Sequence, residues 1–434
     1  MNSIHKYDEL TRRAVLQSIA YSSLGVSIGS SLSSNKIEAA IPGARVASAK
    51  QVVYLYMSGG MSQLDTFDPK PKHPELMGET KAIPTKIDHC QMGGNLSALA
   101  NISDRLAVVR SMNVTTGSHE QANYIAHTNY DQRPDIMHPC MGSWVTQLSG
   151  TNNPSIPGNI RINGGSPTGA GFFDSSHTPL IVRRPDQGIQ YSKKSKFISE
   201  KNFKDRMSLL NKVNDNYLKT HNTKRVKDYN YAYEAAINLM RSQDLKAFDL
   251  DEEPESMKNK YGNNSFGQGC LLARRLVEQK ARFIEVDLGG WDHHFKIYDE
   301  FPDKAKILDQ AMSTLVLDLE QRGLLQETLI VLTTEFGRTP MITEARAGRD
   351  HYPQAFSTVL AGGGIKGGVL YGETDDTCAG IVDKPVYHKD INATIGYAMG
   401  LPLEKILHST SGRPFTAANK GKPLFELFDR PKNA

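Results

Sequence analysis

The feature that most constrains the fold is a set of short apolar runs, each ending in turn residues and polar side chains. The first, QVVYLYM at 51–57, is rich in β-branched and aromatic residues and stops at Ser58-Gly59-Gly60. Similar runs lie at 106–110, 283–288, 329–333 and 357–361. Runs that are apolar on both faces indicate buried strands, so the sequence predicts a sheet covered on both sides.

The clearest helix is predicted over 303–322. Apolar residues recur there at spacings of three and four, and Gly323 stands where a helix C-cap glycine belongs. The helix joins two predicted strands, and strand, helix, strand in that order indicates a right-handed parallel crossover. We therefore expect an α/β fold with a mainly parallel sheet, whose ligands bind beyond the carboxyl ends of the strands.

The N-terminal segment has the pattern of a twin-arginine signal. Arg12 and Arg13 precede a modestly apolar, Ser/Gly-rich stretch at 19–32, so we predict a signal peptide and linker over 1–49. A disordered basic tail is the alternative. The signal implies the twin-arginine export machinery as a partner and a periplasmic or secreted protein. No later apolar run reaches the roughly 18 residues that span a bilayer, so no transmembrane span is expected in the mature protein.

The remaining chain, 50–434, is expected to form a single domain. Its stretch from about 191 to 260 is polar and charged with few strand signals, and we predict a helical insertion there. The 51 basic and 47 acidic residues give a net charge of +4, too even for a nucleic-acid-binding protein. The four cysteines form no CxxC pair, which excludes a zinc ribbon or a thioredoxin motif and leaves a disulfide of open pairing.

Two candidate functional residues follow the first two strands. Asp65 comes soon after Gly59-Gly60, where the backbone can approach a ligand, and is a candidate metal ligand; an Asx turn or helix cap is the alternative. His119 lies at the start of a helical segment, where the helix dipole disfavours a charged imidazole. A neutral, metal-ligating or basic role is therefore plausible for His119, with a simple surface histidine as the alternative.

The next two strands are followed by further acids, histidines and arginines. The loop GGWDHH supplies Asp292 and His294, and imidazole with carboxylate is the ligand set of zinc, manganese or iron. Glu335 and His351 are further candidate ligands. The forked guanidinium groups of Arg338 and Arg349 would suit a bound phosphate or sulfate. The alternative is that Glu335 pairs with Arg338 and that Arg349 pairs with Asp350 at the surface.

These motifs resemble the DUF1501 family, whose members are related to alkaline phosphatases and sulfatases. The resemblance is carried by GGMSQLDTFDPKP, RSM followed by His119, GGWDHH, TEFGRTP, GRDHYP and AGGGIKGGVLYGETDD, in this order along nearly all of the chain after residue 50. It implies an alkaline-phosphatase-like three-layer α/β/α sandwich.

The chain also departs from that superfamily. The aspartate normally found after the first strand is replaced by Ser58-Gly59-Gly60, with Asp65 as the possible substitute, and Glu335-Phe336 stands where an Asp-His pair is usual. The nucleophile position falls at or near His119. No cysteine lies in the CxPxR context that formylglycine sulfatases need.

We expect an exported, metal-dependent hydrolase of a phosphate or sulfate ester, with a small molecule or glycan ester as substrate. A divalent ion (Zn, Mn, Ca or Mg) would be held by Asp65, Asp292, His294, Glu335 and His351. His119, Arg338 and Arg349 would be catalytic, with His119 as ligand or base. The alternative is an inactive relative that binds a glycan or a protein at the cell envelope.

Overall fold

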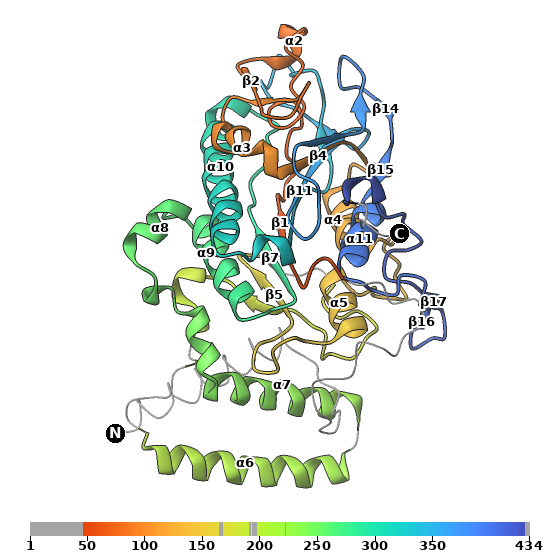
Figure 1. Ribbon diagram of the computed structural model, residues 1–434. Coiled ribbons are helices and arrows are strands. Elements are labelled where there is room, and N and C mark those ends of the chain that lie inside the picture. Colours follow the sequence, from red (N-terminus) through yellow and green to blue (C-terminus); the bar gives the residue numbers. More distant parts are fainter. Residues whose placement is uncertain (1–46, 165–167, 191, 193–197, 222, 430–434) are drawn as a thin grey trace.

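The computed structural model describes residues 47–164, 168–190, 192, 198–221 and 223–429 (Figure 1). Arg12, Arg13 and the apolar stretch of the predicted signal lie outside the described residues. Among the described residues, no helix is both long enough and apolar enough to cross a membrane.

The core is a nine-stranded sheet in the order β12-β4-β11-β8-β1-β7-β5-β6, with β15 beside β4. The five predicted strands are β1 (Gln51–Tyr56), β4 (Leu106–Asn113), β7 (Phe283–Asp287), β8 (Thr328–Thr333) and β11 (Phe356–Ala361). Strand β1 lies between β7 and β8 and is parallel to both, while β11 runs antiparallel to its neighbours β4 and β8. The prediction of an α/β fold with a mainly parallel sheet is confirmed.

The outer strands are short. They are β12 (Val369–Tyr371), β15 (Val386–Tyr387), β5 (Asn159–Ile162) and β6 (Leu180–Val182). Small two-stranded sheets are formed by β2 (Ala82–Pro84) with β3 (Gln91–Gly93), β9 (Gly337–Arg338) with β10 (His351–Tyr352), β13 (Glu373–Thr374) with β14 (Ile381–Asp383), and β16 (Leu407–His408) with β17 (Pro414–Phe415).

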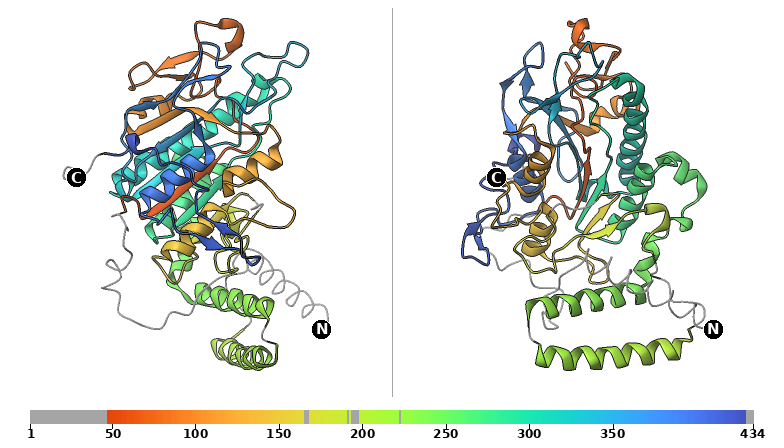
Figure 2. Two further views of the ribbon diagram at one scale, coloured as in Figure 1. Left: turned by 90° about the vertical axis from the view of Figure 1, so that its right-hand side faces the viewer. Right: turned by 180° about the vertical axis from the view of Figure 1, so that it is seen from behind.

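Helices cover both faces of the sheet, which gives three layers (Figures 1 and 2). One face packs against α3 (Ser97–Asn101), α9 (Ser265–Glu278) and α10 (Ile297–Gln321), and the other against α4 (His119–Thr128), α5 (Met141–Ser149) and α11 (His388–Ala398). Side chains of β1 alternate between the two cores: Val53 and Leu55 join the first, Tyr54 and Tyr56 the second. This alternation explains why the strand is apolar throughout.

Helix α10 is the crossover between β7 and β8 that the sequence predicts, although it begins at Ile297 and not at 303. Its residues Leu308, Met312, Leu315 and Leu319 are buried as expected from their spacing. Pro302 lies inside the helix, where its ring nitrogen cannot donate the usual backbone hydrogen bond. The six residues before 303 are helical because Ile297 and Phe301 are fully buried.

The stretch 191–260 holds helices α6 (Glu200–Thr220) and α7 (Lys224–Arg241), followed by α8 (Glu255–Tyr261), and no strand among its described residues. Helices α6 and α7 form an antiparallel pair that stands away from the sheet at one end of the molecule (Figures 1 and 2). A short helix, α2 (Pro74–Met77), belongs to the region at the opposite end.

Candidate metal centre

The candidate site lies at the edge of the sheet where β1, β4, β7 and β8 all end. These strands are parallel, so the segments that follow them leave the sheet at the same edge. His119 is the first residue of α4, after β4, and Asp292 and His294 belong to the loop after β7. Glu335 follows β8, and His351 lies in β10, paired with Arg338 of β9. The topology thus gathers residues that are far apart in sequence.

Glycine at position 59 allows two of these loops to meet. Its φ of 117° is rarely adopted by residues with a side chain, and a Cβ there would lie 2.7 Å from the backbone nitrogens of both Trp291 and Asp292. The close approach directs the Gly59 N–H to Glu335 Oε1, at 2.8 Å. Any other residue at 59 would separate the β1 loop from the Asp292 loop.

Three imidazoles of the site are each held through Nδ1. His119 Nδ1 lies 2.8 Å from Glu335 Oε1, His294 Nδ1 lies 2.8 Å from Asp350 Oδ1, and His351 Nδ1 lies 2.7 Å from the Gly117 carbonyl oxygen. Each partner is an acceptor, so the neutral rings carry their proton on Nδ1 and leave a lone pair on Nε2. Such outer contacts fix the tautomer and orientation of histidines that ligate metals.

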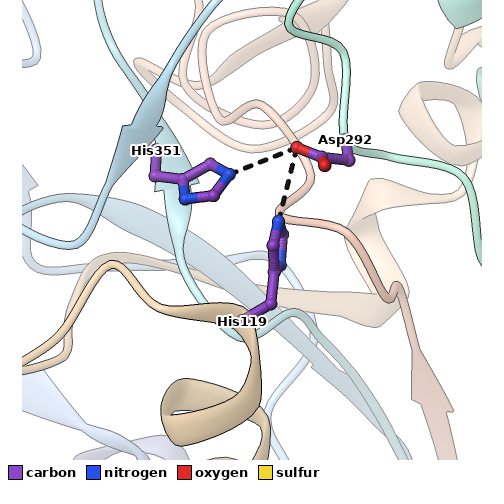
Figure 3. Close-up of side chains that lie close together, drawn as sticks. All are labelled: His119, Asp292 and His351. Atoms are coloured by element: carbon purple, nitrogen blue, oxygen red, sulfur yellow. Dashed lines mark hydrogen bonds and ion pairs between the residues drawn. The ribbon is translucent and has the colours of Figure 1, made fainter.

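Three Nε2 atoms lie around one carboxylate oxygen, Asp292 Oδ1, and Figure 3 shows those of His119 and His351. Its distance is 3.3 Å to His119, 3.3 Å to His351 and 3.0 Å to His294. His119 Nε2 is buried and has no hydrogen-bond partner among the described residues. The Nε2 atoms of His294 and His351 are 2.8 Å apart. Two lone pairs at that distance repel each other unless a proton or a metal ion lies between them.

The donor set fits a divalent ion. The ligand atoms of His119, Asp292 and His351 all lie within 4.8 Å of one another. Four ligands at about 2.1 Å around a tetrahedral zinc ion would be about 3.4 Å apart. Four of the six pairs formed by His119, Asp292, His294 and His351 lie 2.8 to 3.3 Å apart, close to this value, although His294 is not in the group of three. Imidazole nitrogen with one carboxylate suits zinc, manganese or iron better than calcium, which prefers oxygen ligands.

A buried guanidinium borders the cluster. Arg338 is fully buried, and its Nη2 lies 2.5 Å from Asp292 Oδ1. Its Nε donates to the Gly60 carbonyl at 2.8 Å and its Nη1 to the Arg349 carbonyl at 3.1 Å. Because backbone carbonyls hold the group in place, Arg338 presents a fixed positive charge at the edge of the cluster.

The electrostatics favour an ionised Asp292 and a neutral His351. Burial would raise the pKa of Asp292, but the hydrogen bond and charge of Arg338, with His119 and His294, lower it to about 2. Burial is also the main reason why the pKa of His351 is lowered. The hydrogen bond with Glu335 raises the pKa of His119. In the absence of an ion His119 therefore retains a proton more readily than an ordinary histidine, and an ion would replace that proton.

Asp65 and Arg349 are not brought to this cluster. Both side chains are fully buried and form an ion pair, with Arg349 Nε 2.8 Å from Asp65 Oδ2. Hydroxyl groups of Ser62, Thr80 and Tyr298 donate to the same carboxylate, which leaves Asp65 with four partners outside the cluster. Neither the Asx-turn alternative for Asp65 nor a surface pair of Arg349 with Asp350 describes this arrangement. The Asp65–Arg349 ion pair joins the loop after β1 to the segment before β10.

The alternative pairing of Glu335 with Arg338 does not occur either, since Glu335 contacts His119 and Arg338 contacts Asp292.

The sequence analysis missed two residues that contribute to the site. Asp350 holds His294 and is itself held by Arg346, at 2.6 Å. Gly117 acts through its carbonyl group, which no side-chain pattern reveals. The motif GRDHYP contained a signal for Asp350, because an acid adjacent to a ligating histidine is a common outer partner.

Residues 49–428 match the model of a family described as "Protein of unknown function (DUF1501)". The chain belongs to this family. The resemblance drawn from the motifs is thereby confirmed over most of the DUF1501 chain. No curated protein matches it.

Several solved structures resemble the DUF1501 fold at low sequence identity. One, of Ps i-CgsB, is 8% identical with a TM-score of 0.41, and the match covers 86% of this chain and 75% of that one. The alkaline phosphatase from the Antarctic bacterium TAB5 is 9% identical with a TM-score of 0.36, over 81% and 98% of the chains. The PsFucS1 sulfatase from Pseudoalteromonas sp. is 12% identical with a TM-score of 0.36, and the match covers 82% of this chain and 68% of that one. Because each TM-score is below 0.5, these likenesses carry no argument about activity.

The cysteines do not contribute to the site. All four are buried and free, so the disulfide left open by the sequence does not form. Burial raises the pKa of Cys140, which precedes α5, and of Cys270 and Cys378. A buried thiol of raised pKa is a poor nucleophile.

Proposed function

We propose that this protein is a metal-dependent hydrolase of a phosphate or sulfate ester that does not use formylglycine. The observation that carries the proposal is the convergence of three imidazole Nε2 atoms on Asp292 Oδ1, with every Nδ1 held by an acceptor. His119, His294, His351 and Asp292 would hold the ion. When bound, a divalent ion polarises the ester oxygen and lowers the pKa of a bound water, which supplies the nucleophile.

The chain's own residues would do the rest. Glu335 accepts from His119 Nδ1 and from the Gly59 N–H, which fixes the imidazole for the ion or for a proton transfer. Arg338 is placed to stabilise the negative charge that develops on the ester oxygens. Arg349 is a positioning residue, because it donates to the carbonyl groups of Thr339 at 3.1 Å and of Leu76 at 2.6 Å and pairs with Asp65.

A second candidate function is anion or glycan binding without catalysis. It is favoured by the contact of Arg338 with Asp292 Oδ1, the oxygen that an ion would also need. If that ion pair persists, the cluster would hold protons and an anionic ligand in place of a metal ion. The two functions differ in metal content and in turnover.

We also propose export to the periplasm or beyond through the twin-arginine machinery. This rests on Arg12, Arg13 and the apolar stretch that follows them. The route carries folded proteins, so it would allow the metal ion to be inserted before export.

The test of the hydrolase proposal is turnover of p-nitrophenyl phosphate and p-nitrophenyl sulfate. Chelator-treated protein should be inactive, and activity should return with zinc or manganese. His351→Ala should lose both metal and turnover but keep its thermal melting in chelator. His408→Ala, at an exposed histidine outside the cluster, is the matched control and should behave as wild type. If the wild type hydrolyses neither these aryl esters nor a sugar phosphate or sugar sulfate with any divalent ion, the binding function is favoured and the hydrolase proposal is wrong.

A further inference from the structure

A hollow lies near the candidate metal centre, at the same edge of the sheet. Its volume is about 450 Å³, within the range of sites that bind a small organic molecule. It is lined from six elements or loops, by Ser58 after β1, Asn123 of α4, Arg161 of β5, Ser265 of α9, Asp287 of β7 and Lys304 of α10. None of these residues belongs to the metal cluster.

Residues that line the hollow are close in sequence to residues of the cluster. Ser58 directly precedes Gly59, which contacts Glu335. Asn123 lies four residues after His119 on α4, so the two side chains are on the same face of that helix. A molecule with its reacting group at the cluster therefore has this hollow available for the rest of its structure.

Two buried acceptors that line the hollow lack a donor. Asp287 Oδ1 and Asn123 Oδ1 have no hydrogen-bond partner among the described residues. The other carboxylate oxygen, Asp287 Oδ2, accepts from Arg161 Nε at 3.1 Å and Nη2 at 3.0 Å. A Cβ on Gly164 would lie 1.3 Å from Oδ2, so that side of the carboxylate is closed by backbone. Unpaired buried acceptors are costly, and a ligand that donates hydrogen bonds would remove the cost.

The hollow also offers donors. The Lys304 ammonium forms no ion pair among the described residues. Its Nζ lies close to Gly290, where an added Cβ would be 3.0 Å away. Ser58 and Ser265 add hydroxyl groups at the rim. Few of the lining side chains are apolar, and Phe266, one of them, is only 2% exposed and offers no flat aromatic surface.

We propose that this hollow binds a sugar, the alcohol part of the ester that the cluster hydrolyses. The inference rests on the proposed function for the identity of the reacting group. A sugar hydroxyl both donates and accepts, so adjacent hydroxyls satisfy Asp287, Asn123 and Lys304 together. An aryl alcohol would leave both acceptors buried and unpaired, so the hollow selects against it.

The test measures binding of free sugars by saturation-transfer NMR. The probes are glucose, galactose, mannose, N-acetylglucosamine and glucosamine, with p-nitrophenol as the aryl comparison. At least one sugar should bind more tightly than p-nitrophenol. Asn123→Leu should lower the affinity for that sugar about tenfold or more, and Lys304→Ala should lower it about threefold to tenfold. Each variant loses one hydrogen bond to the sugar. Lys306→Ala, an exposed lysine of the same helix, is the control and should bind as wild type.

The sugar assay is independent of hydrolysis. Binding should persist in chelator and in His351→Ala, so a failure of the hydrolase proposal would leave it unchanged. Circular dichroism should show that the Asn123 and Lys304 variants remain folded. The proposal is overturned if no sugar binds, if p-nitrophenol binds more tightly than every sugar, or if folded Asn123→Leu and Lys304→Ala both bind the sugar as wild type does.

Discussion

The replacement of Glu335 by glutamine tests how the site controls its histidines. Glu335 is 1% exposed, and its Oε1 contacts both His119 Nδ1 and the Gly59 N–H at 2.8 Å. Glutamine has the same shape, and its amide oxygen at the position of Oε1 can still accept from both His119 Nδ1 and the Gly59 N–H. Its NH₂ group would take the place of Oε2, beside Thr334 Oγ1. The change therefore removes the negative charge next to His119 and makes its imidazole a weaker ligand.

The expected loss follows from the role of outer partners. Mutation of a residue that orients a ligating histidine typically weakens metal binding about 10- to 100-fold, or about 1.4 to 2.7 kcal/mol. The assay is zinc affinity by competition with a fluorescent chelator, with thermal melting recorded on the same samples. Glu327→Gln is the control, because Glu327 is half exposed and pairs only with Lys50 at the opposite end of β8. An unchanged zinc affinity in a folded Glu335→Gln variant would refute the role given to Glu335 as the outer partner of His119.

Three further outcomes are expected. Arg349→Met leaves the buried Asp65 carboxylate without its counter-ion, so it should lower the free energy of unfolding by about 3–5 kcal/mol in urea denaturation. An unchanged free energy would contradict the structural role given to the Arg349–Asp65 ion pair. Burial lowers the pKa of His388 to about 4. The folded state therefore binds fewer protons, and stability should fall by roughly 2–4 kcal/mol from pH 6.5 to 4, a loss that His388→Phe should reduce; equal pH slopes would be evidence against it. Changing Arg12 and Arg13 to lysine should block export without affecting folding, and normal periplasmic levels would rule out the signal.

The strands that carry the site could be predicted because each is buried on both faces. Strand β1, for example, contributes to both cores, and its composition alone distinguishes it from a surface strand. Strands β5, β6, β12 and β15 have two to four residues and leave too short a pattern to recognise. The antiparallel direction of β11 also leaves no trace in its own residues, because direction depends on how the chain returns to the sheet.

Residue types at the site were predictable, but their partners were not. Asp292 and His294 meet His119 and His351 because four parallel strands end at one edge, which the strand pattern implied. Neighbours in sequence can still point to different places. Arg349 enters the buried pair with Asp65, whereas the next residue, Asp350, turns to His294. Such choices depend on the loop conformation around β9 and β10.

The central claim is that the cluster holds a metal ion, and an anomalous diffraction map at the zinc edge tests it most directly. Crystals of protein purified from its native compartment or reconstituted with zinc would serve. The account predicts one strong peak about 2.1 Å from Nε2 of His294 and His351, within reach of Asp292 Oδ1 and His119 Nε2. The same crystals should show Arg338 drawn away from Asp292 Oδ1. A map without a peak at the cluster, with Arg338 still paired to Asp292, would contradict the claim.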